Sequence, residues 1–241
     1  MMHTISESGA GMSGASAVHM NVFGLNPVVV FGTEAQCRRM LPPIVSGQER
    51  ACFAVTEPNT GLNTTQLKTR AVRQGDKYVV NGQKVWISTA QVAEKILLLA
   101  RTTPLEDVKS PTRGLSLFYT DFDRSRIAVH EIEKMGRKAV DSNELFFADF
   151  EIPIDDHIEE GRGFEYILHG MNPERILIAA EAVGLGQLAL SRAAAYAKSR
   201  VVFNRPIGQN QAIQHPLAKN WMELEAAWLM VMSAGWQYDK G

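Results

Sequence analysis

Hydrophobic and polar residues follow three different patterns along the chain, and the first is helical. Residues 1–50 open with a Gly/Ser-rich stretch and then show helical spacing around Ala17–Gly24 and Glu34–Ile44. The second of these follows Thr33, a candidate N-cap residue, and Pro42-Pro43 come at its expected end. Residues 1–50 therefore predict a helical segment.

The second pattern, from Ala51 to about Pro153, is typical of strands. Asn81-Gly82 is a common hairpin dipeptide, so we expect a tight turn between the first two strands. Short strands at this spacing, without helices between them, favour an antiparallel β-barrel or sandwich over a Rossmann sheet. The runs that predict strands are 77–80, 83–88, 95–100, 115–120 and 145–150.

The third pattern is helical again and extends from Gly161-Arg162-Gly163 to the end of the chain. Asn172-Pro173 predicts a helix start, because proline is well tolerated at the first helical position. That helix extends to about Arg200, and a turn at 204–208 separates it from a second helix at about 210–238. Since a bundle needs about four helices, we expect further helices or another chain to cover these two.

Composition narrows the class of protein. The 241 residues include 25 Lys+Arg and 26 Asp+Glu, which gives a net charge of −1 and excludes a broadly basic nucleic-acid surface. The only cysteines are Cys37 and Cys52, so there is no disulfide framework and a reducing compartment is favoured. The unbroken apolar runs are too short to cross a bilayer and no secretory signal is visible. We expect a soluble, cytoplasmic protein with no membrane span.

Several common chemistries have no support in the sequence. The six histidines lack metal-ligand spacing, so we expect no metal site. Gly184-Leu185-Gly186 lies in a helical run with no strand before it, which favours close helix packing over dinucleotide binding. Two segments are more informative, 54–61 and 82–89, where hydroxyl residues at strand ends could hold a ligand. Taken alone, however, these segments fit ordinary turns, and Trp86 fits a core residue.

Five sequence motifs, taken together, resemble those of a known protein family. In order they are TEPNTG, NGQKVWIS, KMGRKAVDSNELFFADFEIP, ERILIAAEAVGLG and SRVVFNRPIGQNQAIQHPLA. This set resembles the flavin-dependent acyl-CoA dehydrogenase family from about Gly32 onwards. The resemblance implies a helical N-terminal part at 1–50, a middle β domain at 51–157 and the first two helices of a C-terminal bundle at 158–241. It also implies that the chain is a middle piece, truncated at both ends.

The resemblance implies a set of FAD contacts. Phe53, Val55 and Thr56 would lie along the isoalloxazine ring, with the Thr56 hydroxyl on its pyrimidine side. Trp86 would stack on the ring and Ser88 would approach the flavin N5. Three residues would reach the ADP half of the FAD in a neighbouring subunit: Arg200, Phe203 and Gln211. Each of these residues also has a purely structural interpretation. Arg200 could be a cation favoured at a helix C-terminus, Phe203 a core aromatic residue and Gln211 a solvated amide.

The resemblance offers two positions for the catalytic base. Most of the family places this Glu near the C-terminus, beyond the end of this chain. A minority, resembling the isovaleryl- and long-chain-specific branches, place it where Glu174 stands. As a first-turn residue, Glu174 would otherwise be explained by the helix dipole alone, which contributes about 0.3–1 kcal/mol. The residues implied at the substrate are Leu62, Asn172 and Arg175. Leu62 departs from the family's Ser and offers only its backbone N–H.

The implied activity is oxidation of an acyl-CoA to the trans-2-enoyl-CoA, with electrons passed to an electron-transfer flavoprotein. The resemblance implies a homodimer or homotetramer. A flavin oxidase or monooxygenase of the same superfamily, or an inactive truncated scaffold, are the alternatives. Acyl chain length and branching are not fixed by these motifs.

Overall fold

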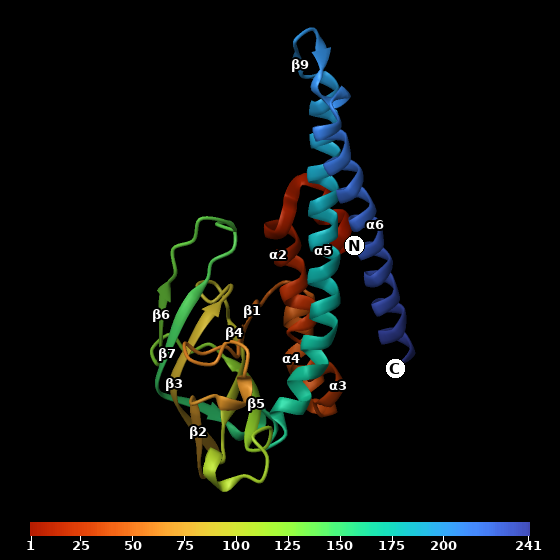
Figure 1. The fold of residues 1–241 in the computed structure, drawn as a ribbon. Coiled ribbons are helices and arrows are strands. Elements are labelled where there is room, and N and C mark those ends of the chain that lie inside the picture. Colours follow the sequence, from red (N-terminus) through yellow and green to blue (C-terminus); the bar gives the residue numbers. More distant parts are fainter. The chain divides into compact units, whose positions relative to one another are not determined.

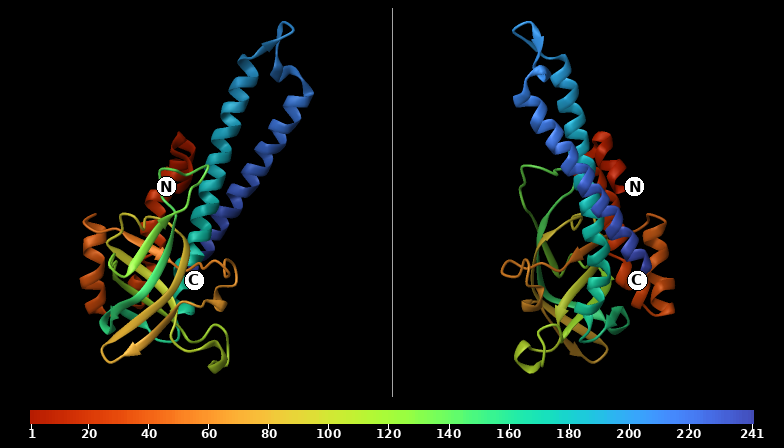
Figure 2. Two further views of the ribbon diagram at one scale, coloured as in Figure 1. Left: turned by 90° about the vertical axis from the view of Figure 1, so that its left-hand side faces the viewer. Right: turned by 45° about the vertical axis from the view of Figure 1, so that its right-hand side comes forward.

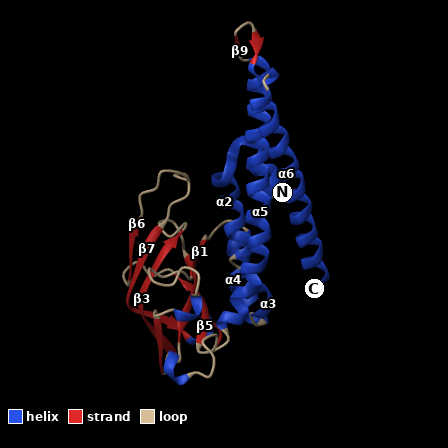
Figure 3. Cartoon of the chain, viewed as in Figure 1, coloured by secondary structure: helices blue, strands red, loops and turns tan.

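Along the chain, helices are followed by strands and then by helices again, in the order that the hydrophobic pattern predicts (Figure 1; Figure 3). This computed structural model describes residues 1–21 and 24–241, so two residues of the predicted 17–24 helix lie outside the described residues. The chain divides into two units by contact. The helical unit comprises Met1–His19 and Pro173–Gly241, and the sheet unit comprises Met20–Asn172. The predicted domain boundaries stay a prediction.

Short helices form the N-terminal part. Thr33 caps α4 as expected: its Oγ1 accepts the Gln36 N–H at 3.2 Å and its N–H donates to Gln36 Oε1 at 2.9 Å. The helix then continues through Pro42 and Pro43. The helices are α1 (Met2–Ile5), the π-helical η1 (Ser6–Ala10), α2 (Gly11–Phe23), α3 (Asn26–Phe31) and α4 (Glu34–Val45).

The described strands of the sheet unit form one eight-stranded sheet in the order β6-β7-β3-β2-β4-β5-β8, with β1 also paired to β4. Figure 2 shows this twisted sheet from two further directions. Most neighbours are antiparallel as predicted, but β1 and β2 each run parallel to β4, so the sheet is mixed. The strands are β1 (Ala51–Ala54), β2 (Arg70–Gln74), β3 (Lys77–Ile87), β4 (Lys95–Arg101), β5 (Leu115–Asp121), β6 (Ile127–Glu131), β7 (Asn143–Pro153) and β8 (His157–Glu159). Short 3-10 turns lie at Thr64–Gln66, Leu105–Asp107 and Ile154–Asp156.

The inner residues of β4, 96–100, are all apolar because both faces of the strand are covered. Ile96 and Leu98 belong to a cluster with residues of β3 and β7, so this face of β4 packs against side chains from other strands of the same sheet. Leu97 and Leu99 point the other way and pack with Leu25, Met40 and Tyr166 from helical segments. An uninterrupted apolar strand is therefore what this position requires.

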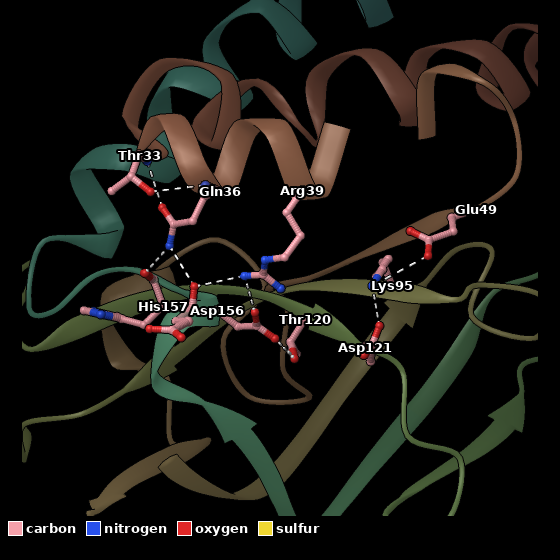
Figure 4. A network of polar contacts seen from close by, with 10 residues as sticks. Thr33, Gln36, Arg39, Glu49, Lys95, Thr120, Asp121, Asp156 and His157 are labelled. Carbon is pink, nitrogen blue, oxygen red and sulfur yellow. Dashed lines mark hydrogen bonds and ion pairs between the residues drawn. The ribbon is translucent and has the colours of Figure 1, made fainter. Parts of the chain in front are cut away.

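Helix α4 is fixed to the sheet by a polar network (Figure 4). Gln36 Nε2 donates to the carbonyl oxygens of Asp155 and His157 at 3.0 and 2.8 Å. Arg39 donates to Asp156 Oδ1 at 2.7 Å, and Asp156 Oδ2 accepts the Thr120 hydroxyl at 2.6 Å. The Gln36 side chain thus joins the helix cap to the 3-10 turn before β8.

The predicted hairpin turn at Asn81-Gly82 is wrong. Strand β3 runs straight through both residues, and its register with β7 shifts between Val80 and Gly82. The hairpin lies earlier, where Gln74 pairs with Lys77. Gly82 has a φ of +152°, and a Cβ there would lie 2.6 Å from the Cα of Thr69. The glycine thus serves a bulge and a close backbone approach rather than a turn.

Substituting Gly82 by Ala should therefore destabilise the chain by about 1–3 kcal/mol, through strain and overpacking together. Gly75→Ala is the matched control, because Gly75 also has a positive φ of +66° but no atom lies within 4 Å of its added Cβ. Urea unfolding of both variants checks this. Equal losses in the two variants would show that contact with Thr69 contributes nothing.

The predicted helix start at Asn172-Pro173 is also wrong, because α5 (Gly163–Ser199) begins ten residues earlier and Pro173 lies inside it. Proline cannot donate to the His169 carbonyl, four residues before it. That oxygen instead accepts a hydrogen bond from Asn26 Nδ2 at 2.5 Å. The helix continues because this side chain replaces the bond that proline removes.

In the helical unit, α5 is followed by β9 (Val201–Val202), β10 (Arg205–Pro206), the 3-10 turn Ile207–Gln209 and α6 (Gln211–Lys240). Close packing at Gly184 and Gly186 is confirmed: a Cβ on Gly184 would collide with the His3 carbonyl, and one on Gly186 would lie 2.6 Å from Leu224. Large apolar side chains on α6 remain exposed, as expected for a partly covered helix: Trp221, Met222, Leu229, Met230, Met232 and Trp236.

Two helical stretches, Met2–Phe31 and Gly163–Ser199, are long and apolar enough to span a membrane by length and composition. Core helices of soluble bundles have the same properties, so this finding is weak evidence. The expectation of no membrane span stays a prediction. No group of three or more His, Cys, Asp or Glu side chains could hold a metal ion within residues 1–21 and 24–241.

Candidate active site

Trp86 stands at a distorted end of β3. The register with β7 shifts between Lys84 and Ile87, and Trp86 has a φ of +64°. A positive φ is unusual for a bulky residue, and a bulge re-aims the side chain that it carries. The indole is 59% exposed, so it is not the core residue that a lone strand tryptophan usually is. Its ring is available to stack on a planar ligand.

The segment 53–56 lies beside this strand end. The Val85 N–H donates to the Thr56 carbonyl at 2.9 Å, which places Thr56 next to Trp86. Phe53, Thr56 and Ser88 are half-buried, whereas the Val55 side chain is buried and can offer a ligand only its backbone. The structure thus brings together the predicted flavin contacts of the sheet unit.

Two hydroxyl groups near this place have no hydrogen-bond partner in the described part of the chain. They are the buried Oγ1 atoms of Thr60, in the TEPNTG turn, and Thr89, next to Ser88. A buried polar atom without a partner is costly, so it marks a site for water or a polar ligand. An exposed Trp86 ring with the hydroxyl residues Thr56 and Ser88 beside it fits a flavin, which has a flat ring and a polar edge.

A buried ion pair supports the segment 55–57. The Lys84 side chain is fully buried and its Nζ donates to Glu57 Oε1 at 3.0 Å and to the Val55 carbonyl at 2.9 Å. Burial lowers the pKa of Lys84 to about 8, against the attraction of Glu57. Burial alone would raise the pKa of Glu57, but Lys84 and hydrogen bonds from Thr69 and Lys68 bring it below its usual value.

Glu174 lies well inside α5 and not in a first turn, which removes the helix-dipole explanation for it. The residue is half-buried. Burial raises the pKa of Glu174, Glu181 adds to the increase, and His19 and Arg175 oppose it. A carboxylate with a raised pKa in a partly desolvated place suits proton abstraction from carbon.

A second polar pair accompanies Glu174 in the helical unit. His19 Nδ1 lies 2.5 Å from Glu181 Oε1, and both side chains are buried. Glu181 follows Glu174 by seven positions, so the two carboxylates share one face of α5. Neither His19 nor Glu181 was predicted, because only the fold brings residues 162 positions apart into contact.

The charge on Glu174 has a consequence for stability that needs no ligand. A carboxyl whose pKa is raised on folding stabilises the fold below its unfolded pKa, and that contribution is lost as pH rises through the folded value. Glu174→Gln should therefore raise the free energy of unfolding at pH 7–8 and have little effect near pH 4. Urea unfolding at both pH values tests this. A variant less stable than wild type at pH 8 would contradict it.

Arg200, Phe203 and Gln211 gather at the tip of the α5–α6 hairpin, where β9 is labelled (Figure 1). Phe203 and Asn204 both have positive φ, +52° and +61°, and connect β9 to β10 as a two-residue turn. Asparagine tolerates this left-handed conformation better than most residues do. The Phe203 ring is 95% exposed, so the core interpretation of this residue is wrong.

The residues implied at the substrate are all exposed. Leu62 lies on the loop after β1 and is 101% exposed. Asn172 is the last residue of the sheet unit and Arg175 lies in the helical unit. The structure does not bring these three residues together within one unit, and their role stays a prediction.

Comparison with known proteins identifies the chain. Family models for the N-terminal, middle and C-terminal domains of acyl-CoA dehydrogenases match residues 1–48, 52–150 and 161–241. The chain belongs to the acyl-CoA dehydrogenase family. The enzymes after which this family is named are oxidoreductases.

The relatives that this chain matches are longer than it is. It is 37% identical over 230 residues to the probable acyl-CoA dehydrogenase YngJ of Bacillus subtilis, covering 95% of this chain and 59% of YngJ. A probable acyl CoA dehydrogenase from Mycobacterium abscessus superposes with a TM-score of 0.92 at 29% identity, covering 100% of this chain and 63% of that one.

A chain in the solved structure of the electron transferring flavoprotein of Acidaminococcus fermentans gives a TM-score of 0.87 at 31% identity. That match covers 95% of this chain and 60% of the other. The chain thus spans about three fifths of the length of the relatives that it matches.

Proposed function

We propose that the protein containing this chain is an FAD-dependent acyl-CoA dehydrogenase that oxidises an acyl-CoA thioester to the trans-2-enoyl-CoA. The observation that carries this proposal is the exposed Trp86 ring, held at positive φ beside Thr56 and Ser88, in a member of the acyl-CoA dehydrogenase family. An aromatic ring kept in a costly conformation indicates a ligand that uses it.

Residues of the sheet unit would hold the flavin ring. Trp86 would stack on one face, the Thr56 hydroxyl would bond the pyrimidine edge, and Ser88 would approach N5. Phe53 and the Val55 backbone would line the same side. When bound, FAD supplies a hydride acceptor for the β carbon of the substrate. The unpartnered hydroxyl groups of Thr60 and Thr89 are the polar atoms that fit such a ligand.

Glu174 would take the α proton of the thioester. A C–H acid of this kind needs a base whose carboxylate is poorly solvated, and burial already raises the pKa of Glu174. Substrate binding would exclude more water and raise its basicity further. Arg175, Asn172 and Leu62 would contact the acyl-CoA, with Leu62 contributing only its backbone N–H.

The tip of the α5–α6 hairpin would contact the FAD that is bound to a different protomer. Glu174 and Arg200 lie about 39 Å apart along α5 at the usual helical rise, so both cannot contact one flavin ring. Arg200, whose guanidinium can donate two parallel hydrogen bonds, suits a pyrophosphate. We propose that Arg200, Phe203 and Gln211 reach the ADP half of a neighbour's FAD, which requires a homodimer or homotetramer.

The remaining parts of the proposal follow the family resemblance. An electron-transfer flavoprotein would accept the electrons, and the match to a chain in such a structure supports this partner. We propose a cytoplasmic location, because the sequence has only two cysteines and so no disulfide framework.

Purification of the full-length gene product tests the proposal. We expect bound flavin, loss of its visible absorbance when an acyl-CoA is added anaerobically, and slow reaction of the reduced enzyme with oxygen. A flavoprotein that no acyl-CoA reduces would refute the dehydrogenase. Rapid oxygen consumption would assign the protein to the oxidases or monooxygenases, and absence of flavin would favour the scaffold.

A further inference from the structure

The segment from Trp86 to Gln91 adopts a backbone conformation that its residue types do not favour. Trp86 and Thr89 both have positive φ, +64° and +67°. An indole side chain or a β-branched side chain in this region is unfavourable, because Cβ crowds the backbone. Such a conformation persists only when surrounding structure fixes it.

Asp141 supplies that fixation from a distant part of the chain. Its Oδ1 accepts the Thr89 N–H at 3.0 Å, and its Oδ2 accepts the Gln91 N–H at 3.2 Å. One half-buried carboxylate therefore holds two backbone amides of the loop that follows β3. The partners lie 52 and 50 positions away, so this is no local turn.

The Asn143 side chain orients the Asp141 carboxylate by hydrogen bonding. Its Nδ2 donates to Asp141 Oδ2 at 2.6 Å and to the Ile87 carbonyl at 2.9 Å. Its Oδ1 accepts Gln91 Nε2 at 3.3 Å, and the side chain is fully buried opposite Ile87 in the β3–β7 register. The network therefore fixes the backbone on both sides of Ser88, at residues 87, 89 and 91.

We propose that Asp141, oriented by Asn143, is a positioning residue that sets where Trp86 and Ser88 meet the flavin. The inference rests on the proposed flavin site and adds to it a residue from the loop before β7, the strand that pairs with β3. Asp141 acts through the backbone, and it determines the place of the Ser88 hydroxyl and of the indole. A purely structural role would make its loss visible only as lower stability.

The first arm of the test uses the chain itself, without flavin. In Asp141→Ala the amides of Thr89 and Gln91 should exchange their hydrogens on the order of tenfold faster than in wild type, because both lose their acceptor. Asp149→Ala is the control. Asp149 lies on β7 near the other register shift, has a positive φ of +48° and accepts Asn81 Nδ2 at 3.0 Å. This control should leave the exchange of Thr89 and Gln91 unchanged.

The second arm uses the full-length flavoprotein. Asp141→Ala should weaken FAD binding and make the bound flavin more fluorescent, since a displaced Trp86 no longer quenches it by stacking. Asp141→Asn, which keeps one acceptor oxygen, should lie between wild type and Asp141→Ala. Far-UV circular dichroism and melting temperature establish that each variant folds.

A second substitution separates positioning from stability. Thr89→Gly relieves the strain at a positive φ, so Asp141→Ala/Thr89→Gly should regain melting temperature but not FAD affinity or flavin quenching. If recovery of stability restores both flavin properties, the positioning role is overturned. Unchanged exchange at Thr89 and Gln91 in Asp141→Ala overturns it as well. If the wild-type protein binds no flavin, the proposed function itself is refuted. If the wild-type protein binds flavin and Asp141→Ala binds it equally well, only the positioning role of Asp141 is refuted.

Discussion

Glu174→Gln should slow reduction of the bound flavin by an acyl-CoA by about 10²–10⁴-fold, the usual contribution of a positioned general base. Glutamine keeps the size of the side chain and its hydrogen-bonding ability but cannot accept the α proton. Acyl-CoA binding should stay nearly unchanged, because the change affects the proton transfer and not the thioester contacts. Anaerobic stopped-flow absorbance with the full-length flavoprotein measures both quantities.

Glu165→Gln is the matched control on the same helix. That carboxylate is exposed and pairs with Arg162 at 2.7 Å, so its loss should leave the rate of reduction unchanged. The pH profile gives a second check: because the pKa of Glu174 is raised above 4.5, the rate should already fall with decreasing pH above that value. A Glu174→Gln enzyme that retains turnover would place the base in the part of the protein beyond this chain.

Lys84→Met should cost about 3–5 kcal/mol in the free energy of unfolding, because it leaves the Glu57 carboxylate buried without its cation. Methionine fills most of the volume of the lysine stem, so packing changes little. The double variant Lys84→Met/Glu57→Gln should recover much of the loss, since no buried charge remains. Urea unfolding of the two single variants and the double variant completes the cycle.

The effect of Lys84→Met should also depend on pH in a definite direction. In wild type the pKa of Glu57 is lowered on folding, so its contribution is present at neutral pH and is lost as pH falls below 4.5. Without Lys84, burial instead favours the protonated carboxyl. The cost of the substitution should therefore shrink between pH 7 and pH 4.5. Equal costs at the two pH values would show that Glu57 is not the group left unpaired.

Local signals in the sequence were sufficient for part of the fold. Thr33 caps α4 as its residue type and position predict, and the apolar residues 96–100 lie in a strand buried on both faces. Asn81-Gly82 and Asn172-Pro173 were misleading, because residues distant in the sequence determine the backbone conformation at each of these two places. Thr69 leaves no room for a Cβ at position 82, and Asn26 supplies the hydrogen bond that lets α5 pass Pro173.

The residues of the candidate site likewise fall into those that local motifs predict and those that only the fold reveals. The motifs around Thr56 and Trp86 are local and were found by resemblance. The two buried ion pairs were not predicted: Lys84 reaches Glu57 across 27 positions in the sheet unit, and His19 reaches Glu181 across 162 positions in the helical unit. Charged residues of this kind look like ordinary surface residues in a sequence, because their burial depends on which strand or helix covers them.

The division of α5 at Pro173 bears on how the chain is made. The sheet unit is continuous and is complete once residue 172 has been synthesised, whereas the helical unit joins Met1–His19 to residues translated after it. Because domains generally fold as they emerge during synthesis, the sheet unit can form first. Until α5 and α6 have been synthesised, the segment Met1–His19 lacks the side chains that cover its apolar residues Met2 and Ala15. The segment Met1–His19 therefore keeps its apolar side chains uncovered for longer than the sheet unit does while the chain is being synthesised.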